Sequence, residues 1–254
     1  MTLSRRRGSY GPTPLSMDLH HLPTRNNAAA GNMAADFMLL QRYPDEHHLR
    51  FRAYGWHRPA FTFGYSQKVA FVRAQLPAEP TPELCRRPTG GGVVDHRFDW
   101  TYALVIPRGH PAYDLRAVES YATIHRSLAE ALQAQQVDAI VKETCDPTPE
   151  EAPCAPGVCF TRAERYDVIR ADTAAKLAGA AQKRNKHGLL FQGSIARGAL
   201  GREIDWDAFE ARFTANLAHH LEVETREVGW PDWSEDEFDG LVEQYGSEEW
   251  NEFR

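Results

Sequence analysis

The chain has little cysteine, no long apolar run and no excess of positive charge. Four of its 254 residues are cysteine; none forms a Cys-x-x-Cys pair, and no histidine lies near them at zinc-finger spacing. We therefore expect neither a structural zinc site nor a disulfide framework. No apolar run approaches the roughly 18 residues of a membrane span. The net charge of −6 gives no global sign of a nucleic-acid partner. We expect no metal, no membrane and no nucleic acid.

What remains is the composition of an ordinary globular protein, 42% hydrophobic and 25% charged. The first residues, MTLSRRRGSYGPTPLSM, are basic, but no apolar stretch follows them, so they are not a secretory signal. We predict a flexible leader over residues 1–28, with Met17 as an alternative start, and a single catalytic domain over 29–254. The predicted location is cytoplasmic, and the default oligomeric state is a monomer.

Periodicity in the sequence predicts many short strands with helices between groups of them. Helices are expected over 32–43, with Asn32 as N-cap, and over 114–135, 205–220 and 234–245, the last opening with a capping box of Ser234 and Glu237. In the second of these helices, one apolar face is expected to hold Val118, Tyr121, Leu128 and Leu132. Strands are expected over 49–56, 60–67, 101–107, 137–142, 167–170, 176–182 and 188–196, with 93–107 forming a hairpin. The expected fold is α+β, with a mixed, mainly antiparallel sheet flanked by helices.

The segment RRPTGGGVVDH, residues 86–96, contains three consecutive glycines. It is not a P-loop, because no Gly-Lys-Ser/Thr follows, and not a dinucleotide fingerprint, because a strand follows instead of a helix. A glycine bulge within a sheet is one interpretation. Polar residues at both ends, Arg86, Arg87 and His96, favour another: bare backbone packed against a ligand, with cationic groups for a carbonyl, carboxylate or phosphate.

Several motifs in order resemble the lipoate–protein ligase and octanoyltransferase family, relatives of biotin protein ligase. RRPTGGGVVDH resembles its signature RR-x-TGGG-x-V-x-H, and KLAGAAQKR (176–184) resembles its lysine motif. NMAADFMLL (32–40) and PAFTFGYSQ (59–67) resemble its first helix and second strand pair, and Glu249-Trp250-Asn251 its terminal motif. The resemblance implies the biotin/lipoate ligase catalytic fold, related to class II aminoacyl-tRNA synthetases. In that fold the glycine-rich strand lines a tunnel for an eight-carbon acyl chain.

The resemblance also implies which residues bind substrate. These are Arg87, Thr89, Gly90, Gly91, Gly92, His96, Gly179, Gln182, Gly193 and Ser194. For His96 a hydrogen-bonded structural role is an equal alternative. Gln192 departs from the family, which has histidine before the Gly-Ser pair.

Two residues are predicted to be catalytic, Cys159 and Lys176. Cys159, in VCFTRAERYD, resembles the nucleophile of one octanoyltransferase branch, and its alternative is a buried, inert thiol. Lys176 is the cation that could lower the pKa of the thiol or stabilise the developing oxyanion. Its alternative is an exposed strand lysine, against which stand the small residues 178–181 that leave room for a substrate. Cys85 would lie inside a strand, where a nucleophile is poorly placed, and Cys145 and Cys154 lie in a proline-rich loop over 144–157.

The resemblance implies an acyltransferase without a cofactor. It would move an octanoyl or lipoyl group from acyl carrier protein to a lysine of a lipoyl domain or a glycine-cleavage H-type protein, through a cysteine thioester. An ATP-dependent lipoate ligase, using ATP and Mg with or without a separate accessory chain, is the alternative, and a non-catalytic acyl-binding protein is a third. The Thr101-Tyr102 pair after His96, and a chain that stops soon after Asn251, favour the transferase. The Gly-Arg-Gly-Arg motif of biotin ligases is absent.

Overall fold

A computed structural model describes residues 16–77, 81–144 and 163–253, and its centre is an eight-stranded sheet. The strand order is β11-β1-β2-β6-β10-β9-β8-β7. Strand β1 pairs in parallel with β2 and β11, and the other neighbours are antiparallel, so the predicted mixed, mainly antiparallel sheet is confirmed. The strands are β1 (Asp18–Leu22), β2 (Leu49–Tyr54), β6 (Asp99–Pro107), β7 (Ala139–Val141), β8 (Val168–Arg170), β9 (Lys176–Asn185), β10 (Gly188–Ala196) and β11 (Glu224–Glu227).

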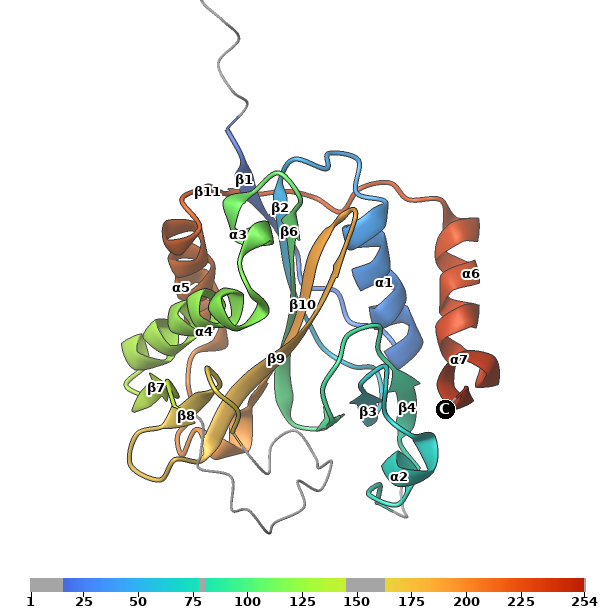
Figure 1. Cartoon of the computed structure of the whole chain (residues 1–254), viewed down its shortest axis with the longest axis horizontal. Helices are drawn as coiled ribbons and strands as arrows, with labels where there is room; N and C mark the ends of the chain where they lie inside the picture. Colours follow the sequence, from blue (N-terminus) through green and yellow to red (C-terminus); the bar gives the residue numbers. More distant parts are fainter. Residues whose placement is uncertain (1–15, 78–80, 145–162, 254) are drawn as a thin grey trace, which may run out of the picture.

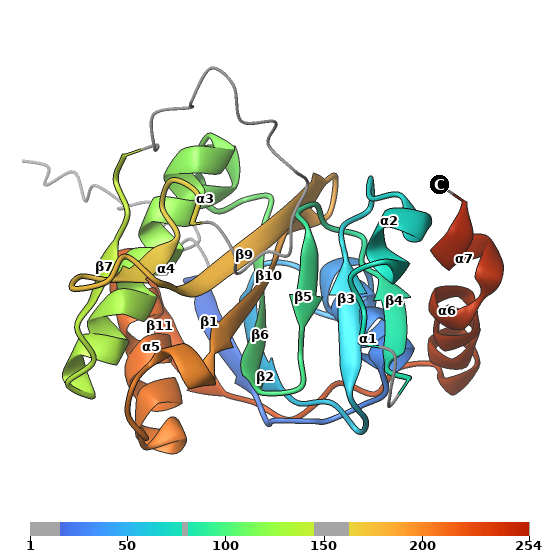
Figure 2. The ribbon, with the colours of Figure 1, turned by 90° about the horizontal axis from the view of Figure 1, so that it is seen from below.

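A second, three-stranded sheet carries the glycine-rich segment. Its central strand β3 (Ala60–Phe63) pairs in parallel with β4 (Glu83–Arg86) and antiparallel with β5 (Val93–Asp95). Figure 2 shows this small sheet next to β6 and β10, between the large sheet and the last helices. The glycines connect β4 to β5. The pocket described below is lined by this segment and by β9 and β10, so it lies where the two sheets meet.

Helices cover both faces of the large sheet (Figure 1). Helices α4 (Ala117–Ala134) and α5 (Trp206–His220) pack on one face over Phe51, Leu104 and Phe191. Helix α1 (Ala29–Gln41) packs on the other face, over Val105 and Leu190, and α6 (Glu235–Gly246) lies against α1. The central strands are therefore apolar on both faces. Short helices complete the fold, namely α2 (Val69–Arg73), α3 (Pro111–Asp114), α7 (Glu248–Glu252) and a 3₁₀ turn at Arg197–Ala199.

Details of three helices differ from the prediction. Helix α1 begins at Ala29, so Asn32 is not its N-cap but a buried residue whose amide donates to the carbonyl of Gly55. Val118 is 45% exposed, because it lies in the first turn of α4, beyond the reach of the core that covers the later turns. Ser234 caps α6 as predicted, but the carboxylate of Glu237 binds Arg42 instead of closing the box.

The predicted hairpin over 93–107 is wrong. Strand β5 pairs with β3 in the small sheet, whereas β6 pairs with β2 and β10 in the large one. The turn between β5 and β6 therefore crosses from one sheet to the other, and periodicity does not reveal this because both strands alternate in the same way. Strand β2 is buried along its whole length, not half-buried, and Arg50 and Arg52 are buried with it.

Residues 18–22 lie within the predicted leader, yet they form β1, between β2 and β11. The sequence there, DLHHL, is too polar to suggest a strand of the main sheet. Residues 1–15 lie outside the described residues, and the division into a leader and one catalytic domain stays a prediction for the rest of the chain. Among the described residues, no helix combines the length and apolar character that a membrane crossing requires.

Candidate functional site

A pocket opens between α1 and the two sheets, with about 500 Å³ of empty space that includes the part open to solvent. Helix α1 contributes Met33 to its wall, and the glycine segment contributes Gly91. Strand β9 contributes Lys176 and Gly179, and β10 contributes Gln192 and its two successors. The lining thus combines apolar side chains, bare backbone and one lysine.

The glycine segment forms one wall by backbone contact. Gly91 has φ +86°, a conformation that side chains disfavour, so glycine is required there. A Cβ at Gly64, at the end of β3, would lie 2.0 Å from the carbonyl oxygen of Gly91, so the two backbones touch directly. Arg87 holds the turn from inside: its guanidinium donates to the carbonyls of Gly90 (2.7 Å) and Gly92 (2.8 Å). The arginine therefore shapes the wall as well as lining the pocket.

The opposite wall carries a buried ion pair between Lys176 and Asp167. The distance from Lys176 Nζ to Asp167 Oδ2 is 2.8 Å, and the two side chains are 7% and 8% exposed. Gly179 makes room for the pair, because a Cβ there would lie 2.8 Å from Asp167 Oδ1 and 2.9 Å from Lys176 Nζ. Lys176 is therefore not an exposed strand lysine, the alternative to its predicted role, and Gly179 leaves the space that its ammonium group occupies.

Asp167 is positioned by the residues around it. Its Oδ2 accepts the backbone N–H of Glu164 at 2.7 Å. The preceding residue, Tyr166, has φ +69°, and its carbonyl lies 2.5 Å from Nδ1 of the buried His125 in α4. A carbonyl can only accept, so Nδ1 of His125 carries the proton. Burial lowers the pKa of His125 and keeps its ring neutral.

A second polar cluster lies where β5 leads into β6. His96 Nδ1 is 2.7 Å from Asp99 Oδ2, and His96 Nε2 is 2.7 Å from Thr62 Oγ1. The Ser194 hydroxyl donates to the same Asp99 oxygen at 2.5 Å, and the ring of Trp56 stacks on His96 at 4.0 Å. Both ring nitrogens of His96 are engaged within the protein, which supports the structural role for this residue.

Comparison with known proteins identifies the family of this chain. Residues 28–210 match the lipoyl protein ligase A/B catalytic domain family. The chain belongs to this family. It is 31% identical over 177 residues to "Octanoyltransferase LipM" of Anoxybacillus flavithermus, covering 67% of this chain and 62% of that protein. It is 33% identical over 171 residues to the Geobacillus kaustophilus protein of the same name, covering 65% and 60%. The match thus spans about three fifths of each relative's length.

Solved structures of lipoate–protein ligases share the fold of this family member. A lipoate protein ligase candidate from T. acidophilum with bound lipoic acid has a TM-score of 0.69 at 16% identity, covering 94% of this chain and 99% of that one. A lipoate-protein ligase A bound with ATP has a TM-score of 0.66 at 17% identity, covering 93% and 98%. At these identities the similarity shows the fold alone, and it confirms the expected ligase-type architecture.

Most of the family's expected site residues surround one pocket. Those that line it are Arg87, Gly91, His96, Lys176, Gly179, Gly193 and Ser194. Thr89, Gly90 and Gln182 do not line the pocket: the Thr89 hydroxyl binds Gln192, Gly90 is exposed, and the Gln182 amide donates to Ala117 O and Ser120 Oγ of α4. Gly92 contributes its carbonyl to Arg87. At Gly193 a Cβ would meet the Tyr102 ring at 2.2 Å, so a neighbouring strand already requires this glycine.

The cysteines separate into one described residue and three others. Cys159, the predicted nucleophile, lies outside the described residues, as do Cys145 and Cys154. Cys85 is buried in β4, its thiol donates toward the carbonyl of Tyr245, and burial raises its pKa to about 12. A thiol so far from ionisation is a poor nucleophile, which agrees with the prediction for a strand interior.

Sequence reasoning did not single out four residues that the structure places at the site. Asp167 pairs with Lys176, and His125 holds the turn before it. Asp36 and Asp99 are buried carboxylates that bind pocket residues. Only Asp167 had a visible signal, the Tyr-Asp pair that ends VCFTRAERYD. The others lie in segments far apart in sequence, where no local pattern marks them.

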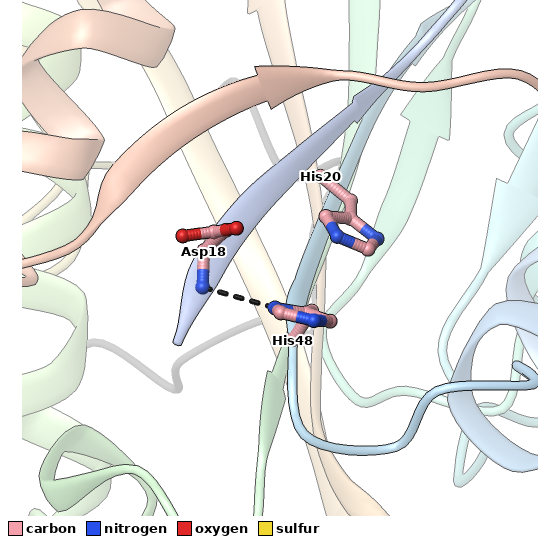
Figure 3. Close-up of side chains that lie close together, drawn as sticks. All are labelled: Asp18, His20 and His48. Atoms are coloured by element: carbon pink, nitrogen blue, oxygen red, sulfur yellow. Dashed lines mark hydrogen bonds between the residues drawn. The ribbon is translucent and has the colours of Figure 1, made fainter. Parts of the chain in front are cut away.

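One group of potential metal ligands lies away from the pocket, formed by Asp18, His20 and His48 (Figure 3). Each has a protein partner: Asp18 Oδ2 binds Arg226, His20 Nδ1 binds the hydroxyl of Tyr43, and His48 Nδ1 accepts the N–H of Asp18. The two imidazole rings are stacked at 4.1 Å, so their in-plane lone pairs run side by side and do not converge. We assign no metal to this group.

Proposed function

We propose that the protein is an octanoyltransferase of the lipoylation system. It takes an octanoyl group from acyl carrier protein, holds it as a thioester on Cys159 and passes it to a lysine of a lipoyl domain or H-type protein. The observation that carries the proposal is the pocket, with a lysine fixed in its wall, in a chain 31–33% identical to relatives named octanoyltransferase.

The pocket suits an apolar tail with a polar head. Met33, Tyr54 and Val94 offer apolar surface, and the glycine wall lets a chain pass close to the backbone. The head of such a substrate is a thioester carbonyl, and Lys176 is the cation on the wall that could face it. Asp167 fixes the ammonium group through a 2.8 Å ion pair, so the charge is preorganised before substrate arrives.

The chemistry consists of two balanced acyl transfers. In the first, the thiolate of Cys159 adds to the octanoyl carbonyl, the bond to the donor sulfur breaks, and the donor leaves as a thiol after protonation. In the second, the neutral amine of the acceptor lysine adds to the Cys159 thioester. The C–S bond then breaks, an amide forms, and the amine proton returns to the thiol. Exchange between thioesters is nearly isoenergetic and amide formation is downhill, so no cofactor is required.

Chain connectivity is compatible with this role for Cys159. Cys159 lies four positions before Ala163 in the sequence, and four residues span at most about 14 Å of extended chain. The Ala163 carbonyl accepts a hydrogen bond from Lys142 Nζ at 2.8 Å, and Asp167 follows four residues later. The nucleophile is therefore tethered by a short segment to the part of the chain that carries the partner of Lys176.

Intact-mass spectrometry after incubation with octanoyl–acyl carrier protein tests the proposal. We expect a single octanoyl adduct that maps to Cys159, disappears on addition of a lipoyl domain, and is absent in Cys159→Ser. The matched control is Cys154→Ser, five residues earlier in the same segment, which should retain the adduct. Full transfer activity in Cys159→Ser, without any adduct, would exclude the thioester route. Lipoate-dependent pyrophosphate exchange in place of the adduct would instead identify an ATP-dependent ligase using Mg.

A further inference from the structure

A chain of buried hydrogen bonds crosses the molecule from β2 to the glycine wall. It begins with an ion pair whose side chains are fully buried, between Arg52 of β2 and Asp36 of α1. Arg52 Nε and Nη2 lie 2.8 and 2.7 Å from Asp36 Oδ1, and Nη2 also donates to the carbonyl of Asn32. The pair fixes one carboxylate oxygen, and the other, Oδ2, accepts the Tyr54 hydroxyl at 3.3 Å and faces Gln192 of β10.

Gln192 of β10 takes up that second oxygen. Its Nε2 donates to Asp36 Oδ2 at 2.6 Å. A carboxylate paired with arginine can only accept, so the amide nitrogen must face Asp36 and the amide oxygen must face away. That oxygen accepts the hydroxyl proton of Thr89 at 2.7 Å. Each bond in the series therefore has one allowed direction, and together they fix the orientation of both side chains.

Thr89 is the residue at which this series reaches the glycine segment. Its side chain is buried, and its carbonyl accepts the N–H of Tyr65 at 2.8 Å. The Arg87 guanidinium donates hydrogen bonds to the carbonyls of Gly90 and Gly92. The wall that faces the pocket is therefore held at two places, by Arg87 within the small sheet and by Gln192 from the large sheet.

We propose that Gln192 is a positioning residue that fixes the glycine wall at the distance from α1 and β10 needed to grip the acyl tail. The kinetic part of this inference rests on the proposed octanoyl transfer, whereas its structural part does not. A neutral histidine offers one ring N–H and one ring acceptor, the same pair of functions as the glutamine amide. A histidine at this position could therefore perform the same task, and Gln192→His is the conservative variant that tests this role.

Hydrogen exchange measured by mass spectrometry on the free protein tests the structural part. In Gln192→Leu, the amide of Tyr65, which donates to the Thr89 carbonyl, should exchange roughly tenfold faster, the factor that corresponds to one lost hydrogen bond. Thr89→Val, which removes the other end of the same bond, should give the same acceleration, and the double variant should add nothing further. Gln192→His should restore protection. The control is Gln133→Leu: the Gln133 amide binds the carbonyl of Ala139 in β7, so exchange at Tyr65 should stay unchanged in this variant.

Steady-state kinetics test the consequence for transfer. Gln192→Leu should raise KM for octanoyl–acyl carrier protein by about tenfold and change kcat by less than about threefold, because tail binding weakens while the reacting groups stay in place. Unchanged exchange of the Tyr65 amide in both Gln192→Leu and Thr89→Val would overturn the inference, even if transfer by the parent protein is confirmed. Accelerated exchange in a protein that transfers no octanoyl group would leave the positioning role standing and remove the proposed function.

Discussion

At the scale of single residues, the site depends on places where a side chain is missing. Gly64 and Gly91 let two backbones touch, Gly179 leaves space for an ion pair, and Gly193 leaves space for an aromatic ring. The sequence alone presents all of these as glycines near a motif. The sequence does not reveal that protein atoms, and not a ligand, lie beside each of these glycines, because most of those atoms belong to another strand or to a distant part of the chain.

The substitution Gly179→Ala is expected to damage activity more than stability. The new methyl group would displace the ends of two flexible side chains, Lys176 and Asp167, which can move at a cost of about 1 kcal/mol. The ammonium group would then leave its fixed position, and we expect octanoyl transfer to fall by on the order of a hundredfold. Transfer rate and thermal melting together provide the measurement.

Gly198→Ala is the matched control for this substitution, because nothing lies within 4 Å of a Cβ at that position. It should melt and transfer octanoyl groups like the parent protein. Normal activity in Gly179→Ala would show that the position of the Lys176 ammonium group is not important for catalysis.

At the scale of elements, the first arginine of the glycine motif anchors the last helix. Arg86 is fully buried, and its guanidinium donates to the carbonyls of Trp250 and Asn251 as well as those of Tyr65 and Gln67. The two ends of the family resemblance, RRPTGGG and Glu-Trp-Asn, are thus parts of one contact. The sequence predicts that Arg86 and Arg87 both bind a ligand, whereas in the structure the Arg86 guanidinium binds backbone carbonyls of the protein itself.

Arg86→Met should therefore lower the free energy of unfolding by about 3 kcal/mol, since several buried carbonyls lose a charged donor. The control is Arg73→Met, which removes the exposed ion pair between Arg73 of α2 and Glu252 of α7. Its loss should lower the free energy of unfolding by well under 1 kcal/mol. Urea denaturation compares the two variants. Equal small losses in both would mean that α7 contributes little to the stability of the small sheet.

Sequence reasoning recovers the elements with strong local signals and misses those defined by distant partners. The strand predicted over 188–196 matches β10 to the residue, because a turn precedes it and a short apolar run, Leu189, Leu190 and Phe191, follows that turn. Strand β1 and the sheet change between β5 and β6 were missed, because polar histidines and a three-residue connection carry no information about which strand lies alongside. The pocket motifs were recognisable, yet Asp36 and His125 were not, since burial of a charged or titratable side chain is invisible in a single sequence.

At the scale of the whole molecule, stability should depend on pH through His21. This residue of β1 lies 2.8 Å from Glu210 of α5 and 2.7 Å from Glu227 of β11, so it joins three elements. Burial alone would lower its pKa, but the hydrogen bonds to Glu210 and Glu227 outweigh burial and raise it above the usual 6.5. The contribution of His21 is therefore fully present below about pH 6.5 and is lost as the pH rises through the folded-state pKa.

His21→Gln should accordingly destabilise the protein more at about pH 6 than at about pH 8.5, by on the order of 1 kcal/mol in the difference between the two pH values. Urea denaturation of the parent protein and the variant at both values provides the measurement. The same destabilisation at both pH values would show that the ring is not protonated in the folded state.

The pocket lies along a seam between two sheets that share no strand pairing in the described residues. Within a sheet, the backbone ladder sets a spacing of about 4.8 Å that substitutions do not alter. Across the seam no strand ladder among the described residues sets the distance between the two sheets. That distance depends on side-chain contacts such as Trp56 stacked on His96 and Thr89 hydrogen-bonded to Gln192. A few substitutions along that line can therefore change the width of the pocket while every strand register stays as it is.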